Sequence, residues 1–220
     1  ADIRLILHLA DSIRREPLRW SLRTRMEIVN YAIQPIWEGL ARRQWSADQL
    51  VAMERELERF DLMRDYSLVL RSDLAWQLKI IDYLRVERMA NSFDCMCGKP
   101  MFWPTLAYRL SPSGWFFMNQ VAMARCHQAA FPTSAELSQR ILSPDIPRRF
   151  EETAGQVRSR SRIPGNLFVA FSLPSLEREA SLCARTQTSV DLARVACALE
   201  RFRLAHGGFP ESLNAVVPTY

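Results

Sequence analysis

The chain has few glycines, and their positions argue against the common nucleotide-binding loops. Seven are present among 220 residues: Gly39, Gly98, Gly114, Gly155, Gly165, Gly207 and Gly208. P-loops and dinucleotide-binding turns need closely spaced glycines because the backbone must wrap around phosphate groups. None of the seven has that spacing, and the Gly-x-Ser-x-Gly turn that carries a nucleophilic serine is absent as well. A nucleotide-binding enzyme of either type is therefore not expected.

Lysine and long apolar runs are scarce too. Only Lys79 and Lys99 are lysines among 29 basic residues, and the formal net charge is +5. Because arginine suits phosphate, a phosphate-binding surface is one interpretation. Surface salt bridging is the preferred interpretation, since the arginines are scattered among Asp and Glu.

No run of 18 apolar residues exists, so no segment is expected to span a membrane. The sequence starts at Ala1 rather than Met, which leaves open a signal or anchor before it.

Histidine is rare, and its spacing excludes helical metal motifs. His8, His127 and His206 have no second histidine three or four residues away, and none follows a glutamate by three positions. Helical zinc proteases and di-iron bundles require those spacings. We expect structural roles for His8 and His127. For His206 we expect a position in the last turn of a helix, where a cation is favourable to the helix dipole.

Cysteine is odd in number and irregular in spacing, which does not indicate a disulfide framework: Cys95, Cys97, Cys126, Cys183 and Cys197. One set resembles a metal site, Cys95-Met-Cys97 with Cys126-His127, because thiolates and imidazole suit zinc. The Cys-x-Cys spacing is tighter than in zinc knuckles, and adjacent helical residues point about 100° apart. Buried free thiols, or a disulfide in an oxidising compartment, are the preferred hypotheses. We predict no catalytic, cofactor-binding or metal-binding residue and no cofactor.

Apolar residues recur at helical spacing almost throughout, and no strand alternation is convincing. Helices are expected over 2–16, 18–43, about 46–60, 62–90, 115–130, about 134–142, 148–161 and 175–206. Residues 143–147 are expected to form a turn, and 164–174 to enclose a buried extended segment or a helical turn. The prediction is an all-α, irregular multi-helix bundle. It has an N-terminal part (1–90), a long ordered loop near 91–114 rich in proline and glycine, and a C-terminal part (115–220), together forming one compact unit.

Several local signals mark helix ends. Capping boxes are predicted at Ser46–Gln49 and Thr133–Glu136. For Trp45, a hydrophobic staple that packs on Leu50 is the alternative to core packing, and Pro35 is predicted to kink its helix. At the other end of the chain, Gly207-Gly208 supplies a left-handed cap, and Pro210 opens a short closing helix.

Charged and aromatic residues are interpreted as structural. The set Glu54, Arg55, Glu56, Glu58 and Arg59 is expected to form a solvated helix face, and Glu151-Glu152 to lie in a first helical turn. Arg158-Ser-Arg-Ser-Arg162 is interpreted as a solvated helix end, with nucleic-acid contact as the alternative. Core packing is expected for most of the six tryptophans: Trp20, Trp37, Trp45, Trp76, Trp103 and Trp115.

The C-terminal helix carries the most distinctive pattern. Leu192, Val195, Leu199 and Phe202 form one ridge, while small residues (Ala193, Ala196, Cys197, Ala205) keep its flank slim and permit close helix approach. Residues 198–213, within a matching stretch 190–218, resemble the turn that follows the long helix of type II secretion major pseudopilins. The chain lacks the hydrophobic assembly helix, sheet and calcium loop of those proteins.

The whole chain is more similar to a family of bacterial helical proteins that share this ending and have no assigned activity. The resemblance is carried by residues 15–17, 36–40, 45–50 and 185–193. Such proteins tend to carry an N-terminal membrane anchor, so the resemblance implies a periplasmic or membrane-anchored location; a cytoplasmic one is the alternative.

The expected function is non-enzymatic, an interaction or structural protein of the bacterial cell envelope, related to a secretion or pseudopilus-like system. The expected partner is another protein or a second copy of the chain. The alternatives are a hydrolase whose site assembles from dispersed residues, and an arginine-rich nucleic-acid-binding module.

Overall fold

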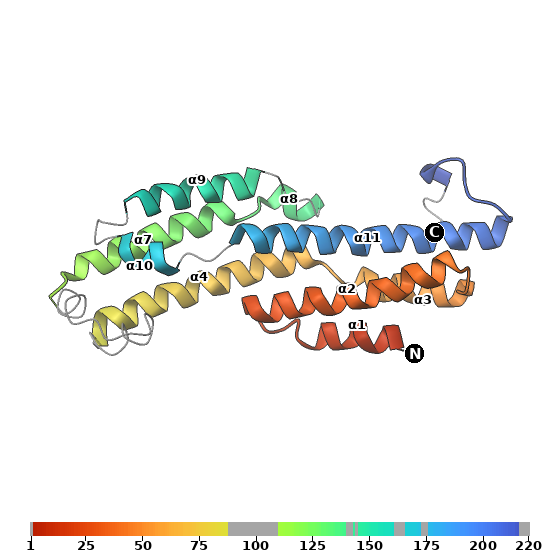
Figure 1. The fold of residues 1–220 in the computed structure, drawn as a ribbon, viewed down its shortest axis with the longest axis horizontal. Helices are drawn as coiled ribbons and strands as arrows, with labels where there is room; N and C mark the ends of the chain where they lie inside the picture. Colours follow the sequence, from red (N-terminus) through yellow and green to blue (C-terminus); the bar gives the residue numbers. More distant parts are fainter. Residues whose placement is uncertain are drawn as a thin grey trace. The chain divides into compact units, whose positions relative to one another are not determined.

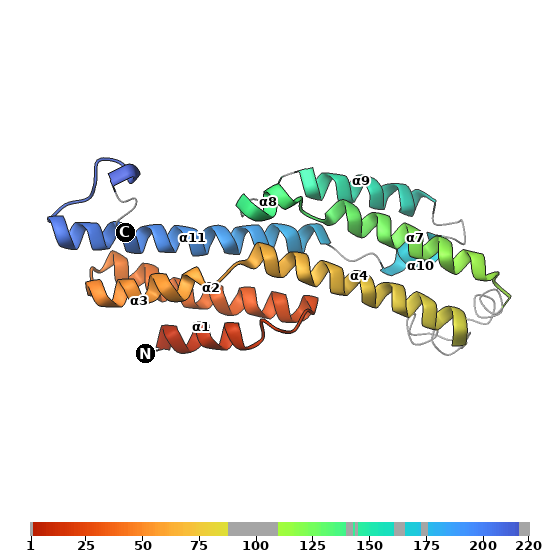
Figure 2. The ribbon, with the colours of Figure 1, turned by 180° about the vertical axis from the view of Figure 1, so that it is seen from behind.

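The computed structural model describes residues 2–87, 110–139, 143, 145–160, 166–172 and 176–215, and every regular element in them is helical (Figures 1 and 2). The predicted all-α, multi-helix fold is confirmed. The elements are α1 (Asp2–Ser12), α2 (Arg19–Ala41), α3 (Ala47–Glu58), α4 (Leu62–Glu87), α7 (Ser113–Ala130), α8 (Ser134–Gln139), α9 (Asp145–Ser159), α10 (Leu167–Ser172), α11 (Leu176–His206) and the 3-10 turn η2 (Leu213–Ala215).

Contacts divide the chain into two compact units made of interleaved segments. Unit 1 contains Ala1–Val69, Ser134–Leu142 and Glu179–Tyr220, and unit 2 contains Leu70–Thr133 and Ser143–Arg178. The long helices α4 and α11 supply residues to both units. The sequence analysis expected an N-terminal part (1–90) and a C-terminal part (115–220), each a continuous stretch of the chain. That division stays a prediction. Most of the loop expected near 91–114 lies outside the described residues.

Unit 1 is built on α1, α2, α3, the start of α4 and most of α11. Helices α1 and α2 lie side by side (Figures 1 and 2). Each helix turns one apolar stripe inward, because buried residues recur every three or four positions. In α2 these include Met26, Val29, Ile33 and Ile36. The predicted burial of Leu50, Met53, Leu57 and Phe60 is confirmed.

Unit 2 is built on the later part of α4 with α7, α9 and α10. The rings of Phe116 and Phe168 stack with centroids 5.6 Å apart. The buried amide oxygen of Asn119 accepts hydrogen bonds from the backbone N–H groups of Phe168 (3.0 Å) and Val169 (3.4 Å). The first N–H groups of a helix have no partner within the helix, so a side chain of α7 caps α10. The segment expected to be extended or helical is therefore helical over α10.

The cap predicted at Ser46 is confirmed. The Gln49 N–H donates to Ser46 Oγ (3.3 Å), and the Ser46 N–H donates to Gln49 Oε1 (2.9 Å). Trp45 donates its indole N–H to the Ile36 carbonyl (3.2 Å) and lies against Gly39, where a Cβ would come within 2.1 Å of the indole nitrogen. Gly39 is thus needed for this close approach. The alternative contact of Trp45 with Leu50 stays a prediction, as does the kink at Pro35, which lies inside α2.

The start of α9 and the element that follows α11 differ from the prediction. Helix α9 begins at Asp145 rather than 148, so Pro147 lies in its first turn, where a missing N–H costs little. Glu151 and Glu152 consequently lie in the second turn. The φ of 78° at Gly207 confirms the left-handed cap. Between Gly207 and Ala215, the last residue described, the chain forms the turn η2 and no helix begins at Pro210. The capping box at Thr133 stays a prediction.

Candidate functional site

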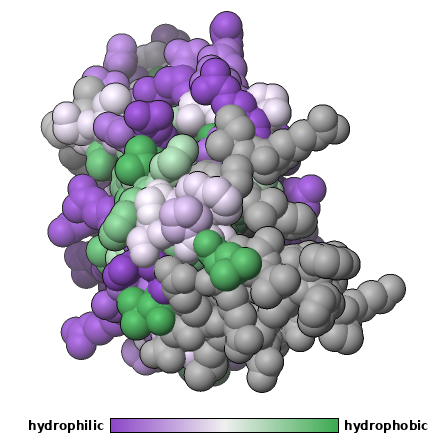
Figure 3. Space-filling model, turned by 90° about the vertical axis from the view of Figure 1, so that its left-hand side faces the viewer, coloured by the Kyte–Doolittle hydropathy of each residue, from purple (hydrophilic) through white to green (hydrophobic). Residues whose placement is uncertain are grey.

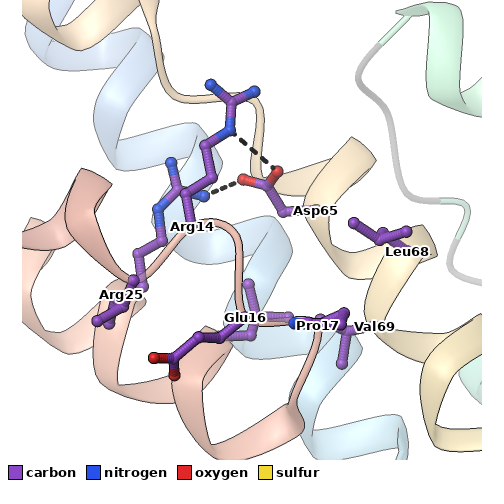
Figure 4. Close-up of a pocket in the computed structure, with 9 residues that line it drawn as sticks. Arg14, Glu16, Pro17, Arg25, Asp65, Leu68 and Val69 are labelled. Atoms are coloured by element: carbon purple, nitrogen blue, oxygen red, sulfur yellow. Dashed lines mark hydrogen bonds and ion pairs between the residues drawn. The ribbon is translucent and has the colours of Figure 1, made fainter.

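A pocket in unit 1 is lined by a buried arginine (Figure 4). Arg25 of α2 is fully buried and forms an ion pair with Asp65 of α4. Its Nε donates to the Ala10 carbonyl of α1 (3.1 Å), and its guanidinium lies 4.9 Å from the centre of the Phe60 ring. Arg14 approaches the other oxygen of Asp65 at 3.6 Å. One side chain therefore ties α1, α2 and the start of α4 together.

A second acid of this pocket region is shared between two arginines. Asp11 accepts a hydrogen bond from Arg59 (2.7 Å) and lies 3.8 Å from Arg25. Buried charges are tolerated when they are paired and hydrogen-bonded, and removing one partner of such a pair costs about 3 to 5 kcal/mol. Because Arg25 and Arg14 pair with Asp65, we interpret this pocket as a structural link between helices. Glu16, which also lines it, accepts a hydrogen bond from the Ser21 hydroxyl (2.7 Å).

The inward side of α11 makes polar contacts with the rest of unit 1. Gln187 is buried; its Oε1 accepts from the Leu62 N–H (2.9 Å), and its Nε2 donates to the Phe60 carbonyl (3.4 Å). The Cys183 thiol donates to the Leu62 carbonyl at 3.1 Å. These bonds satisfy backbone groups at the start of α4, where helix N–H groups lack partners. Asn30 of α2 donates to Thr186 Oγ1 (3.2 Å).

Unit 2 contains a buried imidazole–carboxylate pair that sequence reasoning missed. His127 is completely buried, with Nε2 2.9 Å from Asp73 Oδ2 and Nδ1 3.1 Å from the Met123 carbonyl. A carbonyl only accepts, so the contact with Met123 is a hydrogen bond donated by Nδ1. The structural role expected for His127 agrees with this geometry. Its partner was missed because Asp73 is 54 residues away on another helix.

Both ring nitrogens of His127 are therefore engaged, which leaves none for the zinc set considered above. Cys95 and Cys97 lie outside the described residues, and within the described ones no group of three or more Cys, His, Asp or Glu side chains could hold a metal ion.

The cysteines that the structure describes are free and fully buried: Cys126, Cys183 and Cys197. Burial raises the pKa of the Cys126 thiol to about 11 and that of Cys197 to about 12. Burial also raises the pKa of Cys183, and Asp65 adds to that effect. Thiols that stay protonated are poor nucleophiles, so these three do not supply a hydrolase-type nucleophile.

The sequence analysis expected the charged residues of α3 to form one solvated face, but two of them pair with other helices. Glu54 is partly buried and accepts a 2.6 Å hydrogen bond from Arg201 of α11. Its pKa is raised because burial outweighs the attraction of Arg201. Arg59 bonds to Asp11 of α1. Within α3 the pair that forms is Arg59 with Glu56, three residues apart (3.0 Å). The expected i,i+4 pattern could not show that neighbouring helices offer partners to Glu54 and Arg59.

Tryptophan placement differs from the prediction. Trp20 is 78% exposed, Trp76 65%, Trp37 39% and Trp115 37%. Trp103 lies outside the described residues. On the face drawn in Figure 3, hydrophobic side chains reach the surface among hydrophilic ones. These tryptophans flank buried stripes rather than lie within them, so the core-packing prediction was wrong for these four.

The remaining predicted sites lie at the surface. His8 is exposed. His206 lies in the last turn of α11, as predicted, with its ring stacked on Phe202 at 4.0 Å. Arg158 pairs with Glu151 (3.4 Å), and Arg162 lies outside the described residues.

Helix α11 presents a second apolar face to solvent. The predicted ridge points outward: Leu192 is 55% exposed and Val195 43%, and Leu199 and Phe202 are half-buried. The slim flank is what packs inside unit 1, with Ala193 and Cys197 completely buried. The two faces lie on roughly opposite sides of a helix with 3.6 residues per turn. This outward face is the candidate interaction surface.

Comparison with protein-family models, with curated proteins and with solved structures finds no match to this chain. Among the described residues, no helix combines the length and apolarity needed to cross a membrane.

Proposed function

We propose that this chain is a non-enzymatic interaction protein of the bacterial cell envelope that binds another helical protein through α11. The observation that carries the proposal is the outward apolar face formed by Leu192, Val195, Leu199 and Phe202. An apolar face that stays exposed on a helix already packed on its other side is suited to a protein partner.

The polar clusters support a non-enzymatic role. Arg25 and Asp65, and likewise His127 and Asp73, pair with each other and join helices. The three described thiols are buried. The envelope location, and a link to a secretion or pseudopilus-like system, rest on the resemblance of residues 190–218 and of the whole chain to envelope proteins.

The proposal is tested by photo-crosslinking in living cells of the producing bacterium. A photoreactive residue is placed at Val195 and, as a control, at Leu204, which is equally exposed at 43% but lies off the ridge. We expect a discrete protein adduct in the envelope fraction from position 195 and none from 204. Absence of an adduct at 195, or equal adducts at both positions, would contradict the interaction role. An adduct confined to the cytosol would contradict the envelope role.

A further inference from the structure

The later part of α4, in unit 2, turns an aromatic face to solvent. Trp76 is 65% exposed, Tyr83 53% and Val86 60%, whereas Ile81 and Leu84 are buried. Positions three, four or seven residues apart lie on the same side of a helix, so the three exposed side chains form one row. The two buried residues lie on the other side, where α4 packs within unit 2.

Two cations accompany this row. Lys79 lies within it and Arg71 at its edge; both are exposed, and among the described residues neither has a hydrogen-bond or ion-pair partner. The neighbouring acid Asp82 is neutralised by Arg85 through hydrogen bonds of 2.8 and 3.1 Å, and the Arg85 guanidinium lies 5.2 Å from the centre of the Phe117 ring. The row therefore carries two uncompensated positive charges. We call the following residues the α4 outer face: Arg71, Trp76, Lys79, Tyr83 and Val86.

The contacts of α4 within unit 2 lie away from this face. On the side of α7, Gln120 donates to the Leu78 carbonyl (3.1 Å), and His127 lies 2.9 Å from Asp73. No helix described in unit 2 is drawn along the side of α4 that is turned away from α7 (Figures 1 and 2). At 1.5 Å per residue the α4 outer face is about 22 Å long.

The order of residue types fits the interface of a lipid bilayer. Trp and Tyr are enriched there because their rings are apolar at one end and polar at the other. Lys79 lies between Trp76 and Tyr83 in the row, and its long apolar stem lets the ammonium reach the headgroups while the two rings enter the acyl boundary. An anionic membrane surface strengthens binding about fivefold for each lysine or arginine held near it.

Other occupants fit this face less well. A second copy of the chain would bring two positively charged surfaces together. Protein interfaces collect their charges at the rim and are depleted of lysine at the core. In the α4 outer face the unpaired charge of Lys79 instead lies in the middle of the apolar row. A bilayer interface supplies an anionic layer and an apolar layer side by side along the whole row.

We propose that the α4 outer face binds the anionic surface of a lipid bilayer, with α4 lying in the plane of the membrane. This activity is additional to the protein contact proposed for α11, and it belongs to the other unit. Three apolar side chains and two cations are few for a membrane-binding surface, so the binding is expected to be weak and reversible.

Co-sedimentation of the purified full chain with vesicles tests the proposal. We expect binding to vesicles of phosphatidylglycerol and phosphatidylcholine in equal amounts, much weaker binding to phosphatidylcholine alone, and a loss of binding as salt is raised. Lys79→Gln and Arg71→Gln should each weaken binding to the mixed vesicles about fivefold. Trp76→Ala should weaken it by at least as much, because it removes the largest apolar side chain of the face.

Two exposed positions outside the α4 outer face supply matched controls. Trp20→Ala removes a tryptophan of α2 that is 78% exposed, more than Trp76. Arg149→Gln removes one positive charge from an exposed position of α9. Each should leave the affinity for the mixed vesicles within about twofold of the wild-type value, since charges far from a membrane are screened. Circular dichroism confirms that each variant is folded.

Fluorescence quenching tests the contact itself. Bromine atoms on the acyl chains quench tryptophans that reach the acyl boundary, so mixed vesicles made with brominated phosphatidylcholine should lower the emission of the bound chain. Trp76→Phe should abolish most of this quenching, and Trp20→Phe should retain it.

No binding to the mixed vesicles, equal binding to both kinds of vesicle, or equal weakening by Trp76→Ala and Trp20→Ala would overturn the proposal. A dimer of the purified chain that Trp76→Ala dissociates would assign the face to a second copy. A photo-crosslink from position 79 to a protein in cells would assign it to a protein partner, and either result would overturn lipid binding. The adduct expected at Val195 does not depend on these outcomes, so the function proposed for α11 can stand or fail separately.

Discussion

The two faces of α11 are built in opposite ways. The inward face is rich in small and polar residues, with Gln187, Thr186 and Cys183 making hydrogen bonds to other helices. The outward face carries the larger apolar side chains, Leu192, Val195 and Phe202 among them. The face that packs inside unit 1 is therefore the one with small side chains and hydrogen-bonding partners, rather than the one with the larger apolar side chains. The apolar face left outside is what suggests an interaction protein.

The largest expected effect comes from charging the inward face. Val190 is completely buried, and Val190→Asp would place a carboxylate there without a partner. We expect a loss of about 4 kcal/mol in the free energy of unfolding, the cost typical of an uncompensated buried charge. Urea titration followed by circular dichroism measures it. A loss below about 1 kcal/mol would mean that this face is not packed as described.

A smaller loss is expected from removing the inward hydrogen bonds. Gln187→Leu keeps the approximate volume but leaves the Leu62 N–H and the Phe60 carbonyl without this partner. Unpaired buried polar groups cost about 1 to 3 kcal/mol, so we expect a loss near 2 kcal/mol by the same titration. Gln128→Leu, at an exposed position of α7, is the control and should change stability by less than about 0.5 kcal/mol.

The buried thiols of the inward face predict a dependence on alkaline pH. The pKa of Cys197 is raised by burial from 9.0 to about 12. Above pH 9 the unfolded thiol loses its proton while the folded one keeps it, so stability falls as pH rises through this window. The slope is at most about 1.4 kcal/mol per pH unit for each thiol.

Urea titrations between pH 7 and 10.5 should therefore show a shallower decline for Cys197→Ala than for the wild-type chain. Equal slopes for the two would show that this thiol does not titrate differently in the folded state.

Sequence patterns were sufficient for the helices and their local ends. Helical periodicity located α4 and α11, and the residue types at Ser46 and Gln49 predicted a capping box that forms. Sequence patterns were insufficient where a side-chain contact depends on residues far apart in the sequence. Asp73 meets His127, and Glu54 meets Arg201, only because helices far apart in sequence pack together. For the same reason periodicity identified the ridge Leu192–Phe202 but could not tell which side of α11 would face the core.

One matched pair of substitutions tests the two-faced description of α11 most directly. Val190 and Val195 lie on the same helix, five residues apart, one completely buried and the other 43% exposed. Val195→Asp should change the free energy of unfolding by less than about 0.5 kcal/mol, against about 4 kcal/mol for Val190→Asp. Similar losses for both variants, or a larger one at Val195, would contradict the account.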